Sequence, residues 1–307
     1  MNRLNLQGRV FCVAAAVLCI ATTWLPSLNA LSARTELLVA LVLMGLFGVP
    51  HGALDTLFAQ RLHGLSRALP WLGFVMAYLG LAAAVVALWW WFPVAFLVGF
   101  LVVSAIHFSG DLRHGVSAWA RLFYGSSVVV LPALLHEQQV TQLFAWLINT
   151  GTNTNTNTAS WLVAGLHALG WPCLLGLIVS AAWLARSDRS TAIEIIAVGA
   201  VFTWATPLFG FTLYFCLMHS ARHTLRSQHY AQVTLRTLVK AAVWPLLGLG
   251  VLVAIAWLAL QMLSPQTTVD QRAVQLFFVA LAALTVPHMA LVERVRWSGW
   301  GLDAAGN

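Results

Sequence analysis

The chain has 307 residues, of which 60% are hydrophobic and only 8% are charged, and its formal net charge is +7. Soluble domains carry about 25% charged residues, so this composition excludes a water-soluble globular protein. The excess of Lys and Arg is typical of cytoplasmic loops in membrane proteins, and we expect no nucleic-acid partner. The composition predicts an all-α, polytopic integral membrane protein, with residues 1–307 forming a single transmembrane helical domain.

Apolar runs long enough to cross a bilayer, about 20 residues each, follow one another along almost the whole chain. We predict ten membrane-spanning helices, at approximately 10–31, 36–59, 69–92, 94–112, 118–136, 160–184, 190–205, 208–228, 237–262 and 272–295. The seventh and eighth are divided only by Thr206 and Pro207, because proline breaks a helix interior. The basic start and the sequence NALSA at 29–33 also resemble a signal peptide, but we expect the first helix to be retained.

Basic residues alternate along the chain. Lys and Arg gather at the N-terminus and at or just beyond the end of every second span, at Arg3, Arg9, Arg61, Arg67, Arg113, Arg121, Arg186, Arg189, Arg222, Arg226, Arg236, Lys240, Arg294 and Arg296. The other loops hold only Arg34 and Arg272. Because cytoplasmic loops collect Lys and Arg, we predict cytoplasmic termini and a multi-pass protein of the cell inner (plasma) membrane. The polar repeat TNTNTNT at 152–158 then falls in an exposed loop on the opposite side.

Five of the ten histidines lie near the cytoplasmic ends of predicted spans. They are His51 in PHGALD, His107 in IHFSGD, His219 and His223 in MHSARH, and His288 in VPHMAL. All their spans are even-numbered, and at 1.5 Å per residue the five fall within roughly 5–14 Å of the cytoplasmic end. Because ionisable side chains are costly in lipid and usually face a bundle interior, five at one depth indicate a shared site. The other five suit solvated or singly hydrogen-bonded side chains, at His63, His114, His136, His167 and His229.

The spacing of these histidines suits metal binding. His219 and His223 are four residues apart and therefore share a helix face. Neutral imidazole is the commonest biological metal ligand and suits Fe, Zn, Cu and Ni. We expect His51 and His107 to complete a four-nitrogen set. His288 has no such partner and fits either a fifth ligand or a position beside the ligands.

Two carboxylates repeat one offset from a histidine. Asp55 follows His51 by four residues, and Asp111 follows His107 by four residues. This repetition predicts that both accept hydrogen bonds from the N–H groups of ligand histidines. Either carboxylate could instead pair with a nearby arginine, Arg222 or Arg226, and the sequence leaves both interpretations open.

The four motifs PHGALD, IHFSGD, MHSARH and VPHMAL, in this order from the second predicted span to the tenth, resemble the Brp/Blh family of bacterial and archaeal membrane β-carotene 15,15′-dioxygenases. The resemblance implies a non-haem Fe(II) enzyme that cleaves the central double bond of β-carotene with O2 to give two molecules of all-trans-retinal. It implies that His51, His107, His219 and His223 bind the iron. It also implies a rhodopsin-type protein that receives the retinal.

A long polyene would reach such a site from the membrane lipid, sideways between helices. We expect a tunnel lined by aromatic side chains, with the candidates Phe47, Phe108, Phe211, Tyr214 and Phe215. The same aromatics also suit an ordinary helix-packing core. The sequence has no flavin, haem or iron–sulfur motif, and dioxygenation needs no external reductant, because both oxygen atoms enter the products.

Three other functions compete with this interpretation. Di-iron membrane desaturases need about twice as many histidines, in H-x-x-H-H boxes that this chain lacks. A b-haem carrier needs paired histidines on facing helices, whereas two histidines four residues apart on one helix suit a non-haem ion. A transporter or proton channel, with a relay built from the histidines, Asp55 and Asp111, is the strongest alternative. Metal analysis separates it from the enzyme, because a relay needs no stoichiometric iron.

Overall fold

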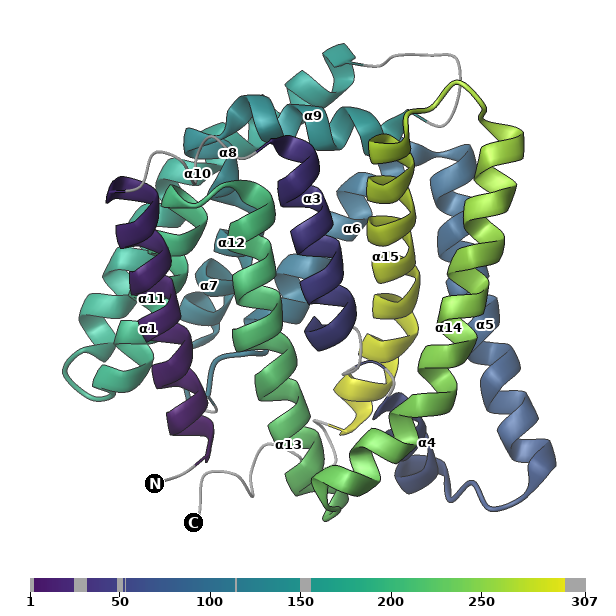
Figure 1. Cartoon of the computed structure of the whole chain (residues 1–307). Coiled ribbons are helices and arrows are strands. Elements are labelled where there is room, and N and C mark those ends of the chain that lie inside the picture. The colour runs from purple at the N-terminus through teal and green to yellow at the C-terminus, as the bar shows by residue number, and fades with distance from the viewer. Residues whose placement is uncertain are drawn as a thin grey trace. The chain divides into compact units, whose positions relative to one another are not determined.

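The computed structural model describes residues 3–24, 32–48, 52, 54–113, 115–149 and 156–295, and within these ranges all regular structure is helical (Figure 1). Six helical segments in these ranges are long and apolar enough to cross a membrane. They are α1 (Arg3–Trp24), α5 (Ala68–Trp91), α7 (Ala118–Val130) with α8 (Pro132–Leu135), α10 (Thr156–Leu184), α14 (Leu235–Leu263) and α15 (Val269–Val295). The described chain therefore has the helices of a multi-pass membrane protein.

The remaining predicted spans contain shorter helices. These are α3 (Ala33–Leu43), the π-helix η1 (Met44–Gly48), α4 (Asp55–His63), α6 (Pro93–Ser109), α11 (Arg189–Trp204), α12 (Pro207–Leu213), the π-helix η3 (Tyr214–Ser220) and α13 (Ala221–Ala231). The predicted break at Thr206 and Pro207 is confirmed, since α11 ends at Trp204 and α12 begins with Pro207. Proline suits the first position of a helix, where its missing N–H has no intrahelical partner.

One region differs from the sequence prediction. The helix α9 (Glu137–Ile148) lies where no helix was expected. It buries Val140, Phe144 and Leu147, whose spacing of four and three residues is that of an amphipathic helix. The expected exposed loop at 152–158 is wrong at its end, because Thr156 to Thr158 belong to α10. Residues 152–155 lie outside the described residues.

The chain forms two compact units, each assembled from segments that are far apart in sequence. Unit 1 comprises Met1–Gly48, Gly99–Trp146 and Thr154–Arg222, and unit 2 comprises Val49–Val98, Leu147–Asn153 and His223–Asn307. The division therefore passes through α6, α9 and α13. The expectation of one domain over residues 1–307 stays a prediction.

In unit 1, α11 packs against α1 and α10, and α10 packs against α7 (Figure 1). The helices α6 and α7 approach each other closely at Gly125, where an added Cβ would collide with the main chain of Ala105 and Ser109. This contact requires glycine and fixes the end of α6, which carries His107. It also fixes the start of the turn that carries Asp111.

In unit 2, α15 packs against α4, α5 and α14 (Figure 1). One side of α5 packs on a small apolar core, in which Trp71, Phe74 and Tyr78 contact the cluster of Ala59, Leu65 and Leu291. The rest of α5, and most of α14, exposes apolar side chains. Such surfaces suit contact with lipid tails, which satisfy no polar group.

Candidate functional site

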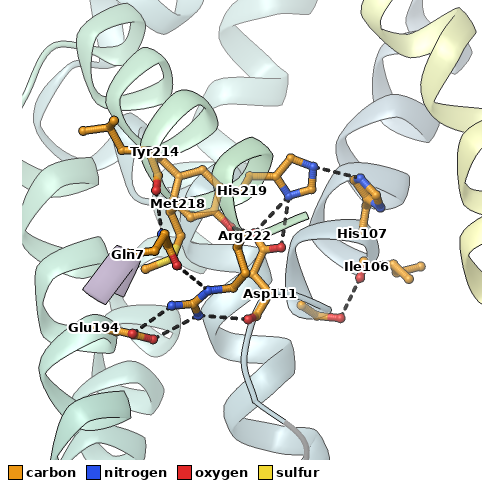
Figure 2. A network of polar contacts seen from close by, with 11 residues as sticks. Gln7, Ile106, His107, Asp111, Glu194, Tyr214, Met218, His219 and Arg222 are labelled. Carbon is orange, nitrogen blue, oxygen red and sulfur yellow. Dashed lines mark hydrogen bonds and ion pairs between the residues drawn. The ribbon is translucent and has the colours of Figure 1, made fainter. Parts of the chain in front are cut away.

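Two histidines face each other in unit 1. His219 is the sixth residue of the π-helix η3, and His107 lies two residues before the end of α6. Their Nε2 atoms are 3.1 Å apart, and the rings meet edge to face with centroids 4.6 Å apart (Figure 2). His219 is 2% exposed. Single π-helical turns are rare and frequently occur at functional sites.

A buried carboxylate orients this pair. The Nδ1 of His219 lies 3.1 Å and 3.0 Å from Oδ1 and Oδ2 of Asp111, and the hydroxyl of Tyr214 donates to Oδ2 at 2.6 Å (Figure 2). An ionised carboxylate only accepts hydrogen bonds, so the His219 Nδ1 carries the proton. The neutral ring then presents the lone pair of Nε2, which is the arrangement of a metal-binding histidine with a carboxylate behind it.

Aromatic side chains surround His219. Phe215 stacks on the imidazole with centroids 5.5 Å apart, and Phe108 meets it edge to face at 5.0 Å. Phe211 stacks in turn on Phe215 at 5.4 Å. Three of the five predicted lining residues therefore gather at this histidine.

The other two predicted lining residues have different positions. Tyr214 is fully buried and binds Asp111 through its hydroxyl. The side chain of Phe47 is 60% exposed, while its main-chain carbonyl accepts a hydrogen bond from Ser220 at 2.7 Å. The polar contact of Tyr214 gives it a part in holding the carboxylate.

A buried ion pair lies beside the unit 1 histidines. The guanidinium of Arg222 donates to both carboxylate oxygens of Glu194, at 2.8 Å and 3.0 Å, and both side chains are almost fully buried (Figure 2). Arg222 also donates to the side-chain oxygen of Gln7 at 2.9 Å and to the main-chain carbonyl of Asp111 at 3.0 Å. Planar, multidentate binding of this kind is what arginine supplies. The network fixes the backbone on which Asp111 is carried.

Unit 2 contains a second assembly of the same side-chain types. The Nδ1 of His288, in α15, lies 2.6 Å from Oδ1 of Asp55, the first residue of α4, and Tyr78 of α5 donates to Oδ2 of the same carboxylate at 2.9 Å. The ring of His223 meets that of His288 edge to face with centroids 4.8 Å apart. Phe58 packs edge to face on His223 at 5.8 Å.

The structure gives partners to residues that the sequence left open. Asp111 accepts from His219, 108 positions away, and Asp55 accepts from His288, 233 positions away. Arg222 pairs with Glu194 and contacts Asp111 through the main chain. The remaining predicted ligand, His51, lies outside the described residues.

Sequence reasoning missed Tyr78, Glu194 and Gln7. A signal was present for each, because a hydroxyl, a carboxylate or an amide inside an apolar helix needs a hydrogen-bonding partner. Glu194 is an acidic residue within the apolar run 190–205, and Tyr78 is one of four tyrosines in the chain.

The donor set fits a metal in its chemistry. Among the described residues, no group of three or more His, Cys, Asp or Glu side chains is arranged to hold a metal ion. The separation of 3.1 Å between the Nε2 atoms of His107 and His219 is nevertheless about that of two nitrogen ligands at right angles on one ion, for metal–nitrogen bonds of about 2.1 Å. Imidazole nitrogens with a carboxylate behind them are suitable ligands for iron.

Comparison with known proteins adds independent information. The profile of the family described as Beta-carotene 15,15'-dioxygenase matches residues 42–296. A beta-carotene 15,15'-dioxygenase from an uncultured marine bacterium, 66A03, is 30% identical over 268 residues, covering 83% of this chain and 92% of the relative. A Halobacterium salinarum protein named probable beta-carotene 15,15'-dioxygenase Blh is 26% identical over 317 residues, covering 89% of this chain and 88% of the relative. No solved structure matches the chain.

Proposed function

The chain belongs to the beta-carotene 15,15'-dioxygenase family, and from this premise we propose that it cleaves the central double bond of β-carotene with O2 to give two molecules of all-trans-retinal. It is an oxygen-incorporating oxidoreductase. The C=C bond breaks, and each of its carbons forms a C=O bond with one oxygen atom of O2, so no external reductant is consumed. The observation that carries the proposal is the family match over residues 42–296, which includes His51, His107, His219, His223 and His288 and both carboxylates.

We propose Fe(II) as the cofactor, with His51, His107, His219 and His223 as its ligands. His219 and His223 lie four residues apart in the continuous helical segment formed by η3 and α13. The Nε2 spacing of His107 and His219 is compatible with ligation by both rings. When bound, the iron supplies the site at which O2 becomes reactive toward a carbon–carbon double bond.

The protein side chains have supporting roles in this proposal. Asp111 keeps the proton of His219 on Nδ1, and Tyr214 holds Asp111 through a hydrogen bond of 2.6 Å. Phe108 and Phe215 cover the imidazole and exclude water from it. We propose that these aromatics, with Phe211, also contact the polyene, whose apolar surface is complementary to theirs.

We further propose that the ten helical ranges each span the inner membrane, with both termini in the cytoplasm. The six long apolar helices and the alternation of Arg-rich loops support this arrangement. β-Carotene would then enter from the membrane lipid, and retinal would pass to a rhodopsin-type protein. A reporter fused after Asp303 is expected to report the cytoplasm, and one inserted within Thr152–Thr158 the opposite side. The same side for both contradicts the topology.

The direct test is expression in a bacterium that accumulates β-carotene. We expect the cells to lose their orange colour while retinal appears, at about two molecules for each β-carotene consumed. A matched strain carrying the His219→Ala variant should keep its colour. Loss of colour without retinal, or with a longer apocarotenal, contradicts central cleavage.

One observation favours a second function. In unit 1, Tyr214, Asp111, His219 and His107 form a continuous hydrogen-bonded chain, and chains of this type carry protons in pumps and transporters. Such a relay needs no bound metal. Proton transport by purified protein in vesicles, unchanged after removal of iron, would support the relay over the enzyme.

A further inference from the structure

In unit 2, the buried His288 contacts a carboxylate that the sequence around the histidine does not predict. His288 is 3% exposed, and its Nδ1 lies 2.6 Å from Oδ1 of Asp55, which is also 3% exposed. The second carboxylate oxygen accepts from the hydroxyl of Tyr78 at 2.9 Å. Tyr78 is partly buried, and burying the imidazole and the carboxylate beside it is costly unless each is hydrogen-bonded. An apolar core at this place would need none of them.

The arrangement of His288, Asp55 and Tyr78 has the same components as an arrangement in unit 1. There, Asp111 accepts from Tyr214 through one oxygen and faces Nδ1 of His219. Each carboxylate-bound histidine also meets a second imidazole edge to face, at 4.6 Å and 69° in unit 1 and at 4.8 Å and 62° in unit 2. His288 therefore corresponds to His219, and Tyr78 corresponds to Tyr214.

This correspondence has a chemical consequence. Because the Asp55 carboxylate accepts the Nδ1 proton, the neutral ring of His288 carries its lone pair on Nε2. A carboxylate behind the distal nitrogen also makes an imidazole more basic and fixes its orientation, as in metal sites. A histidine that served only to fill the core would need one neutral acceptor, such as a main-chain carbonyl.

We infer that His288 binds iron through Nε2 beside His223, whose ring centroid lies 4.8 Å away in the same unit, and that Tyr78 is a positioning residue that acts through Asp55. The inference rests on the proposed function, because it requires that the protein bind iron. His288 is then the unit 2 equivalent of His219. Tyr78 touches neither metal nor substrate, and its effect reaches the iron through the orientation of the His288 ring.

The experiment measures metal binding rather than turnover. Purified wild-type protein and the variants His288→Ala and Tyr78→Phe are titrated anaerobically with Fe(II) against a competing chelator. Each is also loaded with Co(II), whose visible bands report the number and arrangement of nitrogen ligands. The matched controls are His63→Ala, which removes an exposed imidazole from α4 of the same unit, and Tyr230→Phe, which removes a hydroxyl from a ring packed on Phe58.

We expect His288→Ala to weaken Fe(II) binding by more than tenfold and to change the Co(II) bands. Tyr78→Phe should weaken binding by roughly tenfold, at the low end for loss of a group behind a metal ligand, and should shift the same bands. Both controls should match the wild type. A merely structural role would lower the melting temperature but leave the Co(II) bands of the folded protein unmoved.

Two results overturn different claims. Wild-type Co(II) bands and wild-type Fe(II) affinity in folded His288→Ala contradict the inference and leave the proposed function standing. A wild-type protein that forms retinal while binding no iron contradicts the proposed cofactor. If His288→Ala does not fold, Tyr78→Phe decides the matter, because it removes a single oxygen atom, and unmoved bands in it contradict the positioning role.

Discussion

Asp111 in unit 1 and Asp55 in unit 2 each bind a histidine and a tyrosine, but the two aspartates lie in different backbone structures. Asp111 lies in the turn after α6, where its N–H donates to the carbonyl of Phe108 and its carbonyl accepts from Arg222, each at 3.0 Å. Asp55 is the first residue of α4, where the positive end of the helix dipole favours negative charge. The first carboxylate is therefore positioned by a buried ion pair and the second by a helix terminus.

This difference makes the two assemblies unequal in their sensitivity to mutation. A helix terminus is local and survives the loss of a distant side chain. The Arg222 network joins residues that are 28 to 215 positions apart. The loss of Glu194 or Arg222 alone would leave the charge of the other buried without compensation. We expect unit 1 to be the more fragile of the two, although its histidine arrangement is matched in unit 2.

The largest effects should come from the proposed ligands. Changing any of His51, His107, His219 or His223 to Ala should reduce retinal formation to background and lower the iron content of the purified protein, because each change removes a nitrogen donor. Retinal is measured by chromatography and iron by mass spectrometry, in chelator-treated buffers. The variants His63→Ala and His136→Ala, outside both assemblies, should retain both properties. Full activity in any one of the four removes that residue from the ligand set.

Breaking the ion pair should destabilise the protein strongly. We expect Glu194→Ala to cost about 3–5 kcal/mol, because removing one partner of a buried pair leaves the Arg222 charge uncompensated. Thermal unfolding in detergent measures the loss. The double variant Glu194→Leu with Arg222→Met should recover much of the stability, since an apolar pair can replace a buried ion pair. Because the carbonyl of Asp111 would still lack its donor, activity should stay reduced. Full activity in the double variant contradicts the anchoring role of Arg222.

The two carboxylates provide a matched comparison of the units. Asp111→Asn and Asp55→Asn should each lower iron affinity or activity by roughly 10–100-fold, because the amide holds the imidazole without negative charge. Iron should remain bound in part. An unchanged rate in both variants removes these residues from the site. A loss in Asp111→Asn alone would show that the unit 2 assembly is not equivalent.

The smallest effect should come from the tyrosine in unit 1. Tyr214→Phe removes a hydrogen bond of 2.6 Å to Asp111 but leaves the His219 contact in place. We expect activity to fall by roughly tenfold, with a smaller change in iron content than in Asp111→Asn. Steady-state retinal formation and iron analysis measure both. A loss as large as that in His219→Ala would mean that the hydroxyl acts directly in the reaction.

Most of the helices could be predicted from the sequence, because runs of about 20 apolar residues in a chain with few charges are typical of membrane-spanning helices. Even the boundary at Pro207 followed from one residue. The helix α9 was missed because its apolar residues form a stripe rather than a run, which lowers its average hydropathy. The π-helical turns η1 and η3 leave no comparable mark, because a π-turn is a rare, single-turn departure within a helix whose apolar composition is the same as that of its neighbours.

The sequence could predict which residues belong to the site, but it could not predict which of them contact one another. Spacing along one helix reports which side chains share a face, and it selected His219 with His223. It carries no information on partners from distant segments. The contacts of Asp111 with His219 and of Asp55 with His288 are of that kind. The same holds for Tyr78 and Glu194, whose need for a polar partner was foreseeable but whose actual partners depend on how the helices pack.

The central claim is that histidine-bound iron carries out the cleavage, and metal stoichiometry combined with turnover tests it most directly. Purified protein is stripped with a chelator, reloaded with increasing amounts of Fe(II), desalted, and assayed for bound iron and retinal formation in parallel. We expect about one iron per chain at saturation and retinal formation that rises in proportion to bound iron. Retinal formation at the full rate by protein stripped of iron would contradict the claim.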